Sequence, residues 1–144
     1  MTTPNDSLNV QPYLYFEGRC EEALDFYRQA LGAQVQFLMR FKESPAPPDC
    51  APAEGEKVMH ATIRIGSTLL MVSDGRCGGA PSFRGFSLSL NVTSVAEAER
   101  LFAALADGAK VLMPLTKTFF SPSFGMVTDR FGVSWMIHTQ SATS

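Results

Sequence analysis

Apolar and polar residues alternate on both sides of a short turn near the end of the chain. Residues 124–128 and 133–138 each have the pattern of a strand, and Asp129 to Gly132 form the turn between them. Glycine adopts the positive φ that a tight hairpin needs, and an aspartate caps such a turn with its side chain. After the turn, one face is apolar and the other mixed, namely Val133, Trp135 and Ile137 against Ser134, Met136 and His138. This alternation predicts a sheet with one face on a core and the other toward a cavity or solvent.

The first half of the chain predicts one helix among four strands. Apolar residues recur every three or four positions from Cys20 to Leu31, which is the spacing of a helix with one buried face. Gly32 follows in the position where a left-handed C-cap ends a helix. Alternating or aromatic-rich runs predict strands at 11–16, 33–41, 57–65 and 68–73. Four prolines in the segment 44–55 predict a loop there.

The second half repeats this order. Strands are predicted at 86–92 and 109–113, with a helix between them and the terminal hairpin after them. Thr93 or Ser94 is expected to cap that helix, and Glu97 completes a capping box with Ser94. The helix ends match at a constant offset, since Phe26, Gly32-Ala33 and Val35 recur as Phe102, Gly108-Ala109 and Val111. Such a repeat indicates two similar modules.

The repeat also predicts the domain organisation. Two βαβββ modules are expected at 11–74 and 86–139, with a linker at 75–85, a leader at 1–10 and a tail at 140–144. A length of 144 residues suits one structural domain that holds both modules. The fold class is therefore predicted to be α+β, with a curved mixed sheet, helices on its outer side and a concave cleft inside.

Composition narrows the classes of function. A net charge of −2 and a pI near 5.6 give no electrostatic attraction for nucleic acid or an anionic membrane. No apolar run reaches the roughly 18 residues of a membrane helix, and the polar N-terminus does not have the pattern of a signal segment. The three cysteines, Cys20, Cys50 and Cys77, are odd in number and too far apart for a CxxC site. These features predict a cytoplasmic protein that binds neither nucleic acid nor membrane.

Four segments resemble a known family. They are 12–16 (PYLYF), 22–33 (EALDFYRQALGA), 58–66 (VMHATIRIG) and 124–135 (FGMVTDRFGVSW). Together with the doubled βαβββ pattern, they resemble the PhnB-like branch of the vicinal-oxygen-chelate superfamily, which includes glyoxalase I, extradiol dioxygenases and bleomycin-resistance proteins. Some relatives in this branch are labelled as demethylubiquinone methyltransferases. The sequence does not predict methyl transfer, because it has no glycine-rich strand-to-helix turn followed by an acidic ribose-binding residue.

The resemblance implies where a metal would be held. Enzymes of the superfamily bind a divalent metal through His and Glu side chains from four strands. The corresponding positions fall near Pro12, Met71, Ser87 and Met136, none of which is a hard metal ligand. The two histidines, His60 and His138, are metal candidates at other strand positions, with Glu17, Asp74 or Asp129 as acidic helpers. We therefore expect no metal or other cofactor, and a divalent metal at His60 or His138 is the alternative.

Alternation also predicts which side chains line the concave cleft. They are His60, Thr62, Arg64, Met71, Ser87, Ser89, Ser134 and Met136, with Phe120 at the rim beside Phe119 and Phe124. Hydroxyls and methionines beside one imidazole and one guanidinium suit a medium-sized ligand that is partly apolar or anionic. Such serines and methionines also occur as spacers and core fillers. The cluster of Tyr13, Tyr15 and Phe16 is interpreted as core, and Cys20 as either a buried thiol or a reactive one at a helix start.

These observations predict a homodimeric protein that binds a small molecule without a metal, for sequestration or resistance. A second hypothesis is an isomerase, lyase or dioxygenase with a displaced metal site. A third is a structural or partner-binding protein whose cleft is filled by Met and Phe side chains. The pattern leaves open the ligand, the pathway, and whether the cleft lies within one chain or across a dimer.

Overall fold

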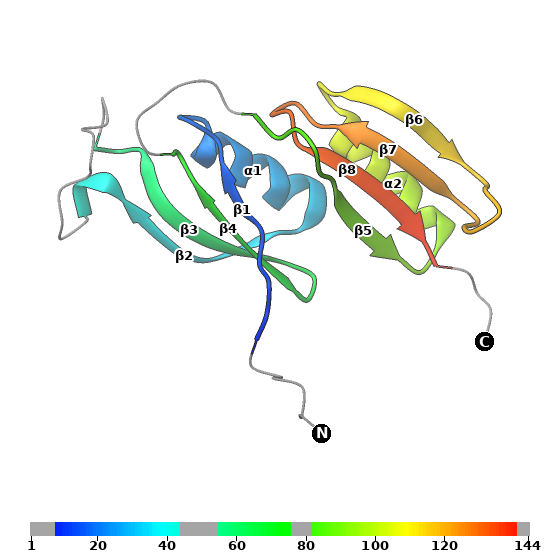
Figure 1. Cartoon of the computed structure of the whole chain (residues 1–144), viewed down its shortest axis with the longest axis horizontal. Coiled ribbons are helices and arrows are strands. Elements are labelled where there is room, and N and C mark those ends of the chain that lie inside the picture. The colour runs from blue at the N-terminus through cyan, green and yellow to red at the C-terminus, as the bar shows by residue number, and fades with distance from the viewer. Residues whose placement is uncertain (1–7, 44–54, 76–81, 141–144) are drawn as a thin grey trace. The chain divides into compact units, whose positions relative to one another are not determined.

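The chain forms two compact units in a computed structural model that describes residues 8–43, 55–75 and 82–140 (Figure 1). Unit 1 consists of Met1–Leu24 and Gly32–Gly79, and unit 2 of Asp25–Leu31 and Ala80–Ser144. The division runs through helix α1 (Cys20–Leu31), whose first residues belong to unit 1 and whose remainder belongs to unit 2. None of the helices in the described ranges is long and apolar enough to span a membrane.

Unit 1 contains a four-stranded mixed sheet in the order β1-β4-β3-β2. Its strands are β1 (Tyr13–Tyr15), β2 (Gln34–Arg40), β3 (Val58–Ile65) and β4 (Thr68–Ser73), and a 3-10 helix η1 (Phe41–Glu43) follows β2. β1 pairs with β4 in parallel, and the other pairs are antiparallel. One face of the sheet is buried, where Leu14, Ala61, Ile63, Leu70 and Val72 are at most 4% exposed.

Unit 2 contains a second sheet of four strands in the order β5-β8-β7-β6. Its elements are β5 (Leu88–Val92), α2 (Val95–Ala106), β6 (Lys110–Thr116), β7 (Phe124–Thr128) and β8 (Ser134–Thr139). Helix α2 contacts all four strands. It contributes Ala98, Leu101 and Leu105 to a core with Val127, Trp135 and Ile137. The opposite face of this sheet is therefore free of α2.

The elements follow the βαβββ order in each half of the chain, as the sequence repeat predicts, which confirms the α+β class and the two modules. The predicted helix limits are also confirmed. Ser94 Oγ accepts a hydrogen bond of 3.1 Å from the backbone N of Glu97, and Gly32 after α1 has a φ of +69°. In the hairpin turn, Gly132 has a φ of +94° and its backbone N donates to the Asp129 carbonyl at 2.9 Å.

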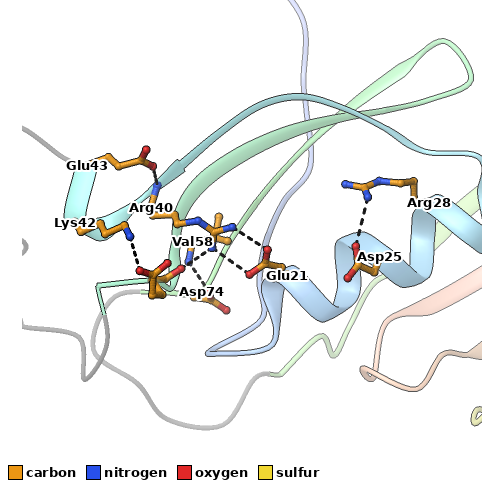
Figure 2. A network of polar contacts seen from close by, with 9 residues as sticks. Glu21, Asp25, Arg28, Arg40, Lys42, Glu43, Val58 and Asp74 are labelled. Carbon is orange, nitrogen blue, oxygen red and sulfur yellow. Dashed lines mark hydrogen bonds and ion pairs between the residues drawn. The ribbon is translucent and has the colours of Figure 1, made fainter.

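A buried carboxylate fixes the start of α1. Asp74 Oδ1 accepts from the backbone N of Gly18 at 2.9 Å and of Cys20 at 2.7 Å. Its Oδ2 accepts from the backbone N of Val58 at 2.7 Å, and Figure 2 shows this pair. The N-terminal amides of a helix lack intrahelical partners, so this carboxylate satisfies donors that burial would otherwise leave unpaired. Asp74 therefore joins β3, β4 and the start of the helix.

The structure departs from the predicted strands at three places. Met59 is an extra residue of β3 in its pairing with β2, so the alternation shifts by one position there. Val58 is therefore buried, whereas strict alternation from Ala61 would bury Met59. Ser87 lies before β5. The strand predicted at 109–113 continues through Pro114 to Thr116, because proline is tolerated in an edge strand such as β6. Most of the predicted loop 44–55 and linker 75–85, and much of the leader and tail, lie outside the described residues.

Candidate functional site

One face of the unit 1 sheet is lined by side chains that alternate with its core. Strand register places Phe37 opposite Thr62, Thr62 opposite Met71, and Met71 opposite Tyr13. His60 precedes Thr62 by two positions on β3 and therefore lies on the same face. We call this surface, made of Tyr13, Tyr15, Phe37, His60, Thr62 and Met71, the tyrosine–histidine face.

A line of hydrogen bonds crosses the tyrosine–histidine face. The Tyr13 hydroxyl lies 2.8 Å from His60 Nδ1, and the Thr62 hydroxyl lies 3.3 Å from His60 Nε2. In a neutral imidazole one ring nitrogen donates and the other accepts. One hydroxyl therefore donates to the ring, and the other accepts from it. The hydroxyl that accepts keeps its own O–H proton free to donate to another acceptor. Such a line can present a polar group to a ligand that covers this face.

Aromatic rings flank these hydrogen bonds. The Tyr13 and Tyr15 rings stack with their centroids 4.9 Å apart, and the Phe37 ring centroid lies 6.0 Å from that of His60. Tyr13 and Tyr15 are each 37% exposed and Phe37 is 48% exposed, so solvent reaches all three. Desolvation by partial burial raises the pKa of Tyr13, so its hydroxyl keeps its proton further into the alkaline range than an ordinary tyrosine does. The face thus combines flat apolar area with neutral polar groups.

The structure brings together three of the predicted cleft residues in unit 1, which are His60, Thr62 and Met71. Arg64 is exposed, and its guanidinium donates a 2.5 Å hydrogen bond to Gln34 Oε1. The interpretation of Tyr13 and Tyr15 as core is wrong, whereas Phe16 is only 1% exposed. Alternation along the strand could have distinguished the exposed tyrosines from the core residues. Leu14 and Phe16 are at even-numbered positions and point to one face, whereas Tyr13 and Tyr15 are at odd-numbered positions and point to the other.

The other predicted cleft residues belong to unit 2. Ser89 pairs with Met136 on the face away from α2, and Ser134 lies on the same face, where its hydroxyl is 3.2 Å from that of Thr128. Ser87 precedes β5. Phe120 stacks in parallel on His138 with ring centroids 5.9 Å apart. Sequence reasoning missed Met113 and Met126, which strand register places beside Met136.

The acidic helpers considered for a metal have other roles. Asp74 accepts three backbone hydrogen bonds, and Asp129 accepts from the backbone N of Phe131 and Val133 and from the Trp135 indole. Both carboxylates are buried, so neither is oriented toward a ligand face. Glu17 has a φ of +49° and lies against Gly75. Among the described residues, no group of three or more His, Cys, Asp and Glu side chains converges.

Cys20 is a buried thiol. It is 0% exposed, and burial together with the Asp74 carboxylate raises its pKa far above the ordinary value of a thiol. The helix start does not produce a thiolate here, since desolvation outweighs the helix dipole. The reactive-thiol interpretation of Cys20 is therefore wrong.

Comparison with known proteins shows relatives over almost the whole chain. A family model described as 3-demethylubiquinone-9 3-methyltransferase matches residues 8–138. Protein YjdN of Escherichia coli (strain K12) is 36% identical over 137 residues, which cover 90% of this chain and 93% of YjdN. The crystal structure of protein PA1353 from Pseudomonas aeruginosa is 48% identical with a TM-score of 0.82, and covers 92% of this chain and 98% of that one.

A second similar structure is that of the PhnB protein from Bacillus cereus, which is described as a 3-demethylubiquinone-9 3-methyltransferase. It is 28% identical, has a TM-score of 0.77, and covers 92% of this chain and 99% of its own. A glyoxalase-related enzyme and two fosfomycin resistance proteins share the fold at 18% identity or less, and that likeness extends to the fold alone.

Proposed function

This chain belongs to the family described as 3-demethylubiquinone-9 3-methyltransferase, the PhnB-like branch of the vicinal-oxygen-chelate superfamily, and from that premise we propose that it binds a small molecule without a metal ion. We do not propose methyl transfer. The connection from β1 to α1, Phe16 to Arg19, contains a single glycine, and the strand-to-helix turn of a nucleotide-binding fold needs several. The description of the family is therefore not taken as the activity of this chain.

The observation that carries the proposal is the Tyr13–His60–Thr62 line on a solvent-accessible aromatic face. Binding sites for small molecules combine mostly apolar walls with a few placed polar groups, and this face has both. The exposed Tyr13, Tyr15 and Phe37 rings offer flat contact area, and the hydroxyl at either end of the line offers a hydrogen bond. We propose a medium-sized, partly apolar ligand that places one polar group at this line.

The hydrogen bonds of His60 support binding without a divalent metal. Both ring nitrogens already have hydroxyl partners, so a metal at His60 would displace one of them. Three or four convergent ligands are the rule for protein-bound zinc, and the nearest side chains here are hydroxyls and aromatic rings. A displaced metal site that serves an isomerase, lyase or dioxygenase is the alternative that the experiment below excludes or establishes.

The first measurement is elemental metal analysis of tag-free protein, followed by titration with nickel, zinc, manganese and iron(II). We expect no stoichiometric divalent metal, and no saturable binding of these four metals that depends on His60. A stoichiometric metal that is lost in His60→Gln would overturn the metal-independent proposal and favour the enzyme hypothesis.

The second measurement is a fragment screen by NMR on the same protein. We expect aromatic fragments with one polar group to shift the signals of Tyr13 and His60. Tyr13→Phe removes one hydrogen bond of the line and His60→Gln alters both, so each variant should weaken binding by about tenfold or more. His138→Gln is the matched control, because it changes the other histidine in unit 2, and it should leave the affinity unchanged. Fragments that bind all three variants equally would contradict a site on this face.

We also propose that the protein is a homodimer, because β6 is an edge strand on which Val111 and Leu112 are 45% and 48% exposed. Sedimentation equilibrium would test this. A monomer at all concentrations would exclude a stable dimer.

A further inference from the structure

Three methionines form a row across three neighbouring strands of unit 2. Met113 of β6 pairs with Met126 of β7, and Met126 pairs with Met136 of β8. Val127, Trp135 and Ile137 alternate with them and are at most 2% exposed, so the three methionines lie on the face away from α2. We call Met113, Met126 and Met136 the methionine row.

The geometry of the row allows its sulfur atoms to converge. Residues directly opposite on one face of an antiparallel pair have Cβ atoms roughly 4.5–5.5 Å apart. Met126 stands between the other two, and an unbranched methionine side chain has three rotatable bonds with which to move its sulfur. Met113 is 38% exposed and the other two are half-buried, so solvent and solutes reach the row.

Strand pairing places hydroxyl side chains beside the row. Ser89 pairs with Met136, and the Thr128 and Ser134 hydroxyls bond to each other at 3.2 Å. His138 follows Met136 by two positions on the same face, beneath the parallel Phe120 ring at 5.9 Å. In the part of the chain that the structure describes, the His138 ring has ring contacts with Phe120 and Phe124 and no hydrogen bond. An imidazole nitrogen is therefore available beside three thioethers.

From this arrangement we propose that the methionine row binds a soft monovalent cation, Cu(I) or its analogue Ag(I), with His138 as an additional ligand. Thioethers are soft, neutral donors that select Cu(I), whereas zinc, magnesium and calcium require thiolate, carboxylate or several imidazole ligands. The proposed ligands include neither His60 nor any residue of unit 1. The proposal therefore stands or falls independently of the proposed function.

The test is titration with silver nitrate, without chloride, of protein carrying ¹³C-methyl methionine. Cys50→Ser and Cys77→Ser in the same chain remove competing thiols, and Cys20 is buried. The protein has seven methionines, of which Met39, Met59 and Met71 are in unit 1 and serve as internal controls. We expect the methyl signals of Met113, Met126 and Met136 to shift together and to saturate at one equivalent. Equal shifts of all methionines, or no shifts, would overturn the proposal.

Variants test the ligands individually. Met126→Leu conserves volume and should weaken Ag(I) binding by about tenfold or more, because even outer partners of metal ligands contribute 10–100-fold to affinity. Met59→Leu in unit 1 is the matched control and should leave the affinity unchanged. Fluorescence of the buried Trp135 would reveal whether Met126→Leu alters the fold. If it does, Met136→Leu provides a second test. Unchanged affinity in a folded Met126→Leu or Met136→Leu protein would show that the row is apolar surface and not a metal site.

Discussion

The Tyr27 hydroxyl donates a 2.5 Å hydrogen bond to Asp129 Oδ2, across 102 residues of sequence. The same oxygen accepts from the Trp135 indole at 2.9 Å, and Oδ1 accepts from the backbone N of Phe131 and Val133 at 2.9 and 3.1 Å. Asp129 is 4% exposed, so water does not compete for these bonds. One carboxylate therefore joins the second part of α1 to the β7–β8 turn within unit 2.

Asp129→Ala should lower the free energy of unfolding by at least about 3 kcal/mol, because it removes the buried acceptor that four donors on buried residues share. Urea unfolding followed by the fluorescence of Trp135, the single tryptophan, measures this directly. Tyr27→Phe removes only one of the bonds and should cost about 1–2 kcal/mol. Equal losses in the two variants would mean that the turn does not depend on the carboxylate.

Tyr27 should make the protein less stable in alkali. Burial, and then the Asp129 charge, raise the pKa of Tyr27 well above 10.0, so the folded protein keeps the phenol proton. In the unfolded chain the phenol loses its proton near pH 10. The stability contribution of neutral Tyr27 is therefore complete below about pH 10 and falls as pH rises further. Urea midpoints at a series of pH values should fall more steeply above about pH 10 in the wild type than in Tyr27→Phe. Parallel curves would contradict this linkage.

Cys20 should be unreactive in the folded protein. Its thiol is fully buried and its pKa is raised, so almost no accessible thiolate exists at neutral pH. In a chain with Cys50→Ser and Cys77→Ser, Ellman's reagent should label Cys20 only as fast as the protein unfolds, and at once in concentrated urea. Rapid labelling without urea would show that the start of α1 opens locally.

Gly125→Ala should destabilise unit 2 by about 1–3 kcal/mol through overpacking. A Cβ at this position would lie 2.8 Å from Phe102 Cε2, 3.0 Å from Leu115 Cδ2 and 3.1 Å from the Met113 carbonyl. Adding Phe102→Leu should recover part of the loss, since it removes the ring that the new methyl meets. Thermal unfolding of the single and double variants measures this coupling, and strictly additive effects would exclude the clash with Phe102.

Part of the candidate site follows from alternation alone. His60 and Thr62 have the same parity on β3, so their common face is a property of the local sequence. Their link to Tyr13 is not local, because the hydrogen bond spans 47 residues and depends on how β1 pairs with β4 and β4 with β3. The methionine row also depends on strand pairing, so it could not be predicted from the sequence. A register shift in β6 brings Met113 opposite Met126.

The sequence by itself determined the repeated βαβββ order, the helix limits and the hairpin at Asp129 to Gly132. Periodicity, caps and turn residues act over a few neighbouring positions and can be read without a partner strand. Only the tertiary structure decided which polar groups are buried with hydrogen-bond partners and which side chains are exposed. Asp74 and Asp129 bond to buried donors, whereas Tyr13 and Tyr15 are exposed beside His60. Those outcomes depend on strand register and burial, which join residues far apart in the chain.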